Sequence, residues 1–194
     1  AYLSAGDFSR AKEYHEKVLS ITKRLGDKRR EGSCYHYIGQ CHAFIGDYRK
    51  AIEYYKRALT ISEAIGDKSE EVVTKSNMGL SYLFQGNYME AEGCLNKALL
   101  IAEEMGDLEI KRSVLTNLAG LCILRGNIEE AFSHLLNSVK IIEGMRGFLG
   151  DSERYQVAFA DKTVGHYRLM AAMLCAMKKF NLAFSVSELG RART

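Results

Sequence analysis

Proline and tryptophan are both absent from the 194 residues of the chain. Proline interrupts helices because its ring removes a backbone hydrogen bond, so its absence permits long, unbroken helices. The chain also lacks any apolar run approaching the roughly 18 residues that span a bilayer, which excludes the membrane-spanning class. It starts at Ala1 with neither an initiator methionine nor a signal-peptide pattern, and we expect it to be a segment of a longer protein.

A strong charge of either sign is missing as well, because the net charge is only +3. With 47% apolar and 26% charged residues, the composition is typical of a folded helical protein rather than a disordered one. Basic residues gather locally at positions 23–24, 28–30, 178–179 and 191–193, where a solvated turn surface explains them. Since no nucleic-acid-binding motif accompanies them, we expect no nucleic-acid partner.

The five cysteines are odd in number and include no C-x-x-C pair. Cys41, Cys122 and Cys175 fall in the first helix of a pair and have apolar neighbours, where a free cysteine packs as a small hydrophobe. This usage predicts reduced thiols and a cytoplasmic location.

What the chain does contain is an internal repeat. The stretch Gly46–Ala58 recurs every forty residues, with its glycine at Gly6, Gly86 and Gly126. A second step with the same period lies half a repeat away, at residues 26–27, 66–67 and 106–107. Self-similarity at a period of this length indicates a solenoid of stacked units.

Each half-repeat reads as one helix between two Gly-Asp or Gly-Asn steps. The glycine closes one helix in the left-handed conformation, and the Asp or Asn caps the next. The helices expected are 7–25, 27–45, 47–65, 67–85, 87–105, 107–125 and 127–145. Small residues at equivalent positions, such as Gly39 with Ala51 and Gly79 with Ala91, predict that antiparallel pairs approach closely.

The register breaks once, near residue 146. The step expected there occurs instead at Gly150-Asp151, and the position equivalent to Gly126 is Lys178, 52 residues later. We therefore predict a longer helix at 151–177 or an extra turn in the junction at 144–150, followed by a last helix from about Lys179. The predicted domains are 1–145, the regular array, and 146–194, an atypical pair that joins a following domain.

These patterns resemble the tetratricopeptide repeat (TPR). The small-large pattern of that family is visible in the following residues: Tyr35, Ile38, Gly39, His42, Gly46, Tyr48, Ala51, Tyr55 and Ala58. Here the repeat has 40 residues instead of the usual 34, and an extra helical turn replaces the final proline. The variant is similar to the arrays of Pins/LGN polarity adaptors and to the repeats that precede CHAT domains in large animal proteins. The resemblance implies an all-α right-handed α-solenoid of antiparallel helix pairs.

The last stretch, Phe184–Arg193, is similar to the E-x-G-R-A-R helix with which such arrays join CHAT domains, which are related to caspase-like peptidases. The resemblance implies that a peptidase-like domain lies beyond Thr194.

The TPR resemblance also implies a concave groove for a peptide or partner domain, lined by the first helix of each pair. The implied residues are Ser33, His36, Gln40, Phe44, Val73, Ser76, Asn77, Leu80, Leu83, Phe84, Ser113, Thr116, Asn117, Ile123 and Leu124. Almost no lysine or arginine is among them, so a clamp for a peptide's terminal carboxylate is not expected. An external ligand and the protein's own missing segments are both open as occupants.

The residues give little indication of catalysis or metal binding. His36 and His42 lie near Cys34 and Cys41 on one helix. About two helical turns separate Cys34 from Cys41 and His36 from His42, which is too far for a compact tetrahedral site. The glycines at 144, 147 and 150 lack the lysine and the preceding strand of a phosphate loop. We therefore expect no catalytic residue, cofactor or metal ligand.

Three functional hypotheses follow. The first is a non-enzymatic scaffold that binds a protein or peptide in its groove. The second is a structural or regulatory arm that packs against a C-terminal domain of the same protein. The third is self-association through the cut ends of the array, where apolar faces need a cap.

Overall fold

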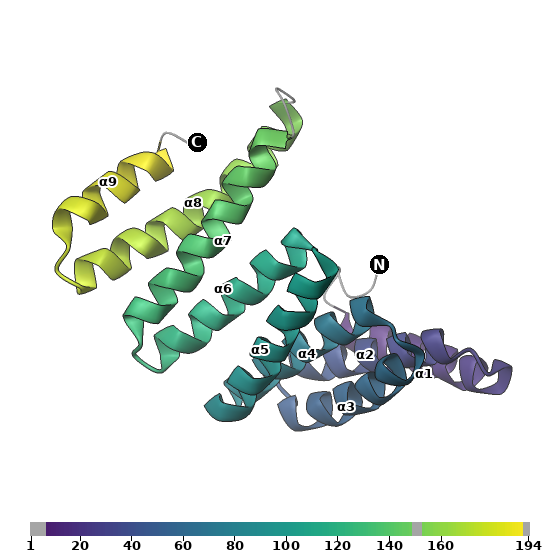
Figure 1. Ribbon diagram of the computed structural model, residues 1–194. Helices are drawn as coiled ribbons and strands as arrows, with labels where there is room; N and C mark the ends of the chain where they lie inside the picture. Colours follow the sequence, from purple (N-terminus) through teal and green to yellow (C-terminus); the bar gives the residue numbers. More distant parts are fainter. Residues whose placement is uncertain (1–6, 149–152, 192–194) are drawn as a thin grey trace. The chain divides into compact units, whose positions relative to one another are not determined.

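The computed structural model describes the backbone of residues 7–148 and 153–191, and the side chains of residues 7–144 and 164–191. The described backbone forms nine α-helices (Figure 1). They are α1 (Phe8–Leu25), α2 (Lys28–Phe44), α3 (Tyr48–Ile65), α4 (Lys68–Phe84), α5 (Tyr88–Met105), α6 (Leu108–Leu124), α7 (Ile128–Phe148), α8 (Glu153–Ala176) and α9 (Phe180–Arg191). None of these helices is long and apolar enough to cross a bilayer.

The six Gly-Asp and Gly-Asn steps make the turns that the sequence predicts. All six glycines, from Gly26 to Gly126, have φ between 66° and 82°, which is the left-handed region. Asp7, Asp27, Asp47, Asp67 and Asp107 each accept a hydrogen bond from the backbone N–H three residues later. One dipeptide therefore ends a helix and begins the next.

Asn87 departs from the predicted capping. Its side chain makes no bond to the start of α5, and its Nδ2 donates instead to Gln85 Oε1 at 3.3 Å. An amide carries donors as well as an acceptor, so it has a local partner that aspartate lacks.

The junction predicted at residues 144–150 is wrong in its first part, because α7 continues as a helix through Phe148. No Gly-Asp step stands at 146–147 to end it. The Gly150-Asp151 step lies outside the described residues. α7 has 21 residues and α8 has 24, against 17 or 18 in each earlier helix, as expected for an atypical last repeat.

Lys178 takes the place of the turn glycine between α8 and α9. Its φ is 58°, and it is the one non-glycine residue with a positive φ in the described chain. Lys178 N–H bonds to Cys175 O at 2.9 Å and Lys179 N–H to Leu174 O at 2.8 Å, which repeats the bonds of Gly126 and Asn127. The alignment of Lys178 with Gly126 made from the sequence is thus confirmed.

The helices group into two compact units, residues 1–106 and 107–194. In the first, helices α1 to α5 pack in chain order and α2 also contacts α4. In the second, α6 to α9 pack in chain order. The domain boundary predicted at residues 145 and 146 stays a prediction.

The core of the first unit is centred on one face of α3. Ala51, Ile52, Tyr55 and Leu59 are buried against Met78 of α4. In the second unit a separate core joins residues of α6, α7 and α8, among them Ala119, Leu135 and Met170. Cys41 and Cys122 are buried as predicted, but Cys175 is exposed. Met173 and Leu174 beside it are buried, and the next residue of the helix points away from that buried face.

Candidate functional site

The predicted groove residues of the first unit lie on α2 and α4 with different exposures. On α2, His36 is buried, Ser33 and Gln40 are half-buried, and Phe44 is exposed. On α4, Val73 and Phe84 are exposed, Asn77 and Leu80 are half-buried, and Ser76 and Leu83 are buried.

Part of this set surrounds an apolar cleft of about 340 Å³. Its walls come from α2, α3 and α4, all within the first unit. The lining residues are Gln40, Ala43, Phe44, Tyr48, Tyr55, Asn77, Leu80, Ser81 and Phe84. This volume is at the lower end of the roughly 300–1,000 Å³ of ligand pockets, enough for side chains of a bound segment.

Three of the lining residues take part in two aromatic stacks. Phe44 stacks on Phe8 of α1 with ring centroids 4.8 Å apart, and Phe84 stacks on Tyr48 of α3 at 5.2 Å. Phe44 remains 58% exposed and Phe84 62% exposed. The stacks hold the two rings in place, and their exposed area suits a hydrophobic contact with a ligand.

The cleft is electrically neutral, because no charged side chain is among its lining residues. Its polar groups are the amides of Gln40 and Asn77, the Ser81 hydroxyl and the two tyrosine hydroxyls. Amides can donate to and accept from a peptide backbone. An uncharged, apolar segment therefore fits this surface better than an acidic or basic one.

A buried network beneath the cleft positions Asn77. His36 Nδ1 and Thr74 Oγ1 are 2.8 Å apart, and Asn77 Nδ2 lies 3.5 Å from His36 Nε2. A neutral ring with its proton on Nδ1 satisfies both contacts, since it donates to Thr74 and accepts from Asn77. The orientation of the Asn77 amide thus depends on the neutral form of His36.

Burial keeps that ring neutral. Desolvation, with repulsion from His15 as a smaller cause, lowers the pKa of His36 to about 4. Glu70 Oε1 lies 3.5 Å from His36 Nδ1, and Glu70 Oε2 accepts a 3.1 Å hydrogen bond from Ser33. Burial also raises the pKa of Glu70.

Ser76 and Leu83 do not line the cleft. Ser33, His36 and Val73 are likewise absent from its lining. The sequence reasoning missed Tyr48, Tyr55 and Ser81. Tyr48 carried a signal in the sequence, because Phe8 and Tyr88 occupy the same position in neighbouring repeats.

The predicted residues of the second unit lie on α6. Ser113 and Leu124 are exposed, whereas Thr116, Asn117 and Ile123 are half-buried. Thr116 Oγ1 is 3.2 Å from both Ser138 Oγ and His166 Nε2. Thr116 lies two repeats of forty residues after His36. His166 is equivalent to Thr74 when the last repeat is counted as 52 residues instead of forty. The same His–Thr contact thus joins α6 to α8, with the residue types exchanged.

The sequence model of the family described as Tetratricopeptide repeat matches residues 1–64 and 70–143. No curated protein sequence matches the chain.

Several solved structures are similar. BtubC (BKLC) from P. vanneervenii has a TM-score of 0.82 at 20% identity, covering 99% of this chain and 75% of that one. A Podosopora anserina putative kinesin light chain with nearly identical TPR-like repeats has a TM-score of 0.73 at 17% identity, covering 99% and 89%. Rap Protein complexed with Competence and Sporulation Factor has a TM-score of 0.76 at 13% identity, covering 99% and 50%. At these identities the likeness establishes the fold alone.

Proposed function

The chain belongs to the tetratricopeptide repeat family, and we propose that it is a non-enzymatic scaffold whose α2–α4 cleft binds an uncharged, apolar segment of a partner protein. Tetratricopeptide repeat proteins generally mediate protein–protein interactions. The observation that carries the proposal is the cleft itself, which combines two exposed phenylalanines with amide groups and no charge.

The geometry favours one mode of binding. An apolar side chain of the partner enters between Phe44 and Phe84, and the amides of Asn77 and Gln40 bond to the partner's backbone. Affinity then comes mainly from apolar contact, and the amides set the register. Among proteins of this fold, Rap has been solved complexed with Competence and Sporulation Factor, which supports a ligand-binding use of the array.

The test starts from a displayed library of random peptides selected on the whole 194-residue chain. Synthetic versions of the recovered peptides are then titrated by fluorescence anisotropy. We expect a consensus with one large apolar residue and no excess of charge. Phe84→Ser and Asn77→Ala each weaken binding at least tenfold, or about 1.4 kcal/mol.

Leu100→Ser is the matched control, because Leu100 is 60% exposed on α5, outside the cleft. It should leave the affinity unchanged, and circular dichroism should show equal helix content in all variants. A charged consensus, or equal affinity for Phe84→Ser and the parent chain, would overturn the proposal. If no peptide is selected and the mass by light scattering rises with concentration, self-association takes its place.

A further inference from the structure

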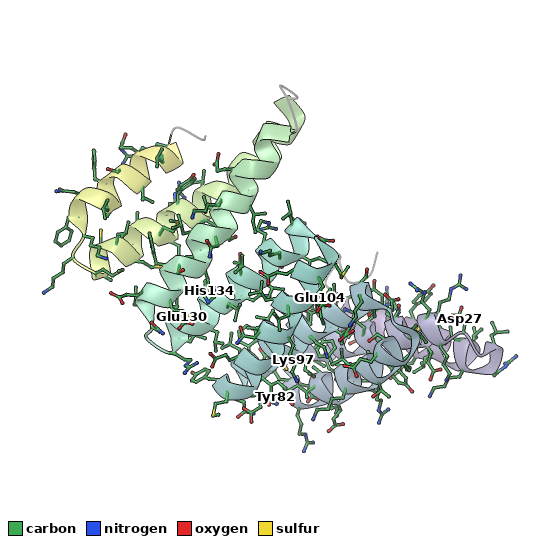
Figure 2. All side chains as sticks on the ribbon, viewed as in Figure 1. Asp27, Tyr82, Lys97, Glu104, Glu130 and His134 are labelled. Carbon is green, nitrogen blue, oxygen red and sulfur yellow. The ribbon has the colours of Figure 1, made fainter. Side chains whose placement is uncertain are left out.

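Cys122, Glu130 and His134 bring three metal-ligating side chains together in the second unit. One candidate ligand atom from each lies within 4.8 Å of the other two. Cys122 is on α6, whereas Glu130 and His134 lie one turn apart in the first half of α7 (Figure 2). No other group of this kind occurs among the side chains that the structure describes.

The repeat geometry explains why these positions meet. The residues equivalent to Cys122 and His134 one repeat earlier are Tyr82 and Cys94, which pack against the same core of the first unit. Two repeats earlier they are His42 and Tyr54, whose rings stack at 5.4 Å. This pair of positions therefore faces across the two helices in each repeat, and in the third repeat it holds a thiol and an imidazole.

The carboxylate is already oriented. Asn127 Nδ2 donates to Glu130 Oε2, and Glu130 Oε1 lies 3.9 Å from His134 Nε2. Ligating carboxylates are usually held by such an outer hydrogen bond. The Asn127 contact thus directs one oxygen of Glu130 towards His134.

The distances require only a small closure. With Zn–N and Zn–O of about 2.0–2.1 Å and Zn–S of about 2.3 Å, the ligand atoms of a tetrahedral ion are about 3.3–3.6 Å apart. Cys122 is buried and fixed in the core, but the Glu130 side chain is 49% exposed and that of His134 20% exposed. Rotation of these two side chains can bring the atoms together, and their exposure gives an ion access.

We propose that Cys122, Glu130 and His134 bind one Zn²⁺ ion, which links α6 to α7 across their turn. Water takes the fourth position. A thiol, an imidazole and a carboxylate suit Zn²⁺, whereas Ca²⁺ and Mg²⁺ prefer oxygen ligands alone. On binding, the Cys122 thiol gives its proton to solvent and the sulfur takes up the metal, so affinity rises with pH.

The test uses the whole chain, kept reduced and freed of metal. Zn²⁺ affinity is measured by competition with a chromophoric chelator, and Co²⁺ replaces Zn²⁺ for absorption spectra. We expect one ion per chain, and a thiolate-to-Co²⁺ charge-transfer band. Cys122→Ser removes the band. Cys122→Ser and His134→Gln each weaken Zn²⁺ binding by at least about tenfold, because the loss of a residue that only supports a ligand already weakens metal binding by about tenfold or more.

Two matched controls separate this site from other thiols. Cys94→Ser alters the position equivalent to His134 one repeat earlier, and Cys175→Ser removes the exposed thiol. Both should bind Zn²⁺ as the parent chain does. Loss of binding in Cys175→Ser, unchanged binding in His134→Gln, or no binding by the parent chain would each overturn the proposal. His134→Gln keeps the test valid if Cys122→Ser fails to fold, because His134 is only half-buried.

Discussion

Protonation of His36 affects both the stability of the fold and the cleft, because the neutral ring accepts a hydrogen bond from the Asn77 amide. The imidazole is buried between α2 and α4, and its pKa of about 4 lies below the ordinary value of 6.5. Below pH 6.5 the unfolded chain therefore binds a proton that the folded chain does not, and the folded state loses stability as pH falls towards 4. At higher pH both states are neutral at this residue, and its contribution is complete.

We predict that the free energy of unfolding falls between pH 6.5 and pH 4, by at most about 3 kcal/mol from His36, at about 1.4 kcal/mol per pKa unit. Glu70 opposes part of this loss, since its raised pKa lets the folded state take up a proton there first. Urea unfolding at several pH values measures the slope. His36→Gln, which cannot titrate, should flatten it, and parallel curves for the two proteins would contradict the prediction.

Lys178 tests the cost of a side chain at a turn position. With φ at 58°, it occupies a region that costs an L-residue about 1–2 kcal/mol. We predict that Lys178→Gly raises the free energy of unfolding by about 1 kcal/mol, somewhat less than the full strain because glycine loses more backbone entropy on folding. The shift in urea midpoint measures it.

The reciprocal change is Gly126→Lys, at φ 77° in the equivalent turn. A Cβ at Gly126 meets nothing within 4 Å, so only backbone conformation contributes. It should lower stability by a similar amount. Stability that is unchanged by both substitutions would show that φ at these turns adapts to the side chain.

At the scale of the element, one small residue allows the two helices of a pair to approach closely. A Cβ at Gly79 of α4 would lie 2.9 Å from Leu95 Cγ and 3.3 Å from Ala91 O of α5. Gly39 meets Tyr55 and Ala51 O in the same way. These contacts confirm the close approach that the sequence predicts, and they explain why the two helices meet at this position.

We predict that Gly79→Ala lowers the free energy of unfolding by about 1–3 kcal/mol, because Leu95 is fully buried and cannot move aside freely. Gly93→Ala on α5 is the matched control. A Cβ at Gly93 meets nothing within 4 Å, and alanine should gain up to about 1 kcal/mol from helix propensity. Thermal or urea unfolding compares the two, and equal effects of the two substitutions would refute the packing argument.

At the scale of the whole molecule, the same repeat serves different purposes along the chain. In the first unit the helix pairs enclose an apolar cleft. In the second, Cys122 and His134, which are equivalent to the stacked His42 and Tyr54 of the first unit and not to cleft residues, form a candidate metal site with Glu130. A repeat requires only that its inward positions fill the space between two helices, so their chemistry can change from one repeat to the next.

The sequence by itself determined the helices, the turns and the pairing, because these depend on local chemistry repeated every forty residues. Glycine at the turn, aspartate at the cap and a small residue at the helix contact act over a few positions. The one helix end that was misplaced, at Phe148, lacks this local step.

Only the tertiary structure decided which predicted groove residues reach solvent. Leu80 and Leu83 lie on the same helix and look alike in sequence, yet Leu83 is buried while Leu80 lines the cleft with Tyr48 and Tyr55 of α3. It also decided that Cys122 meets Glu130 and His134. The physical reason is that burial and convergence depend on the rotation of each helix against its neighbours, which is set by non-local packing rather than by local pattern.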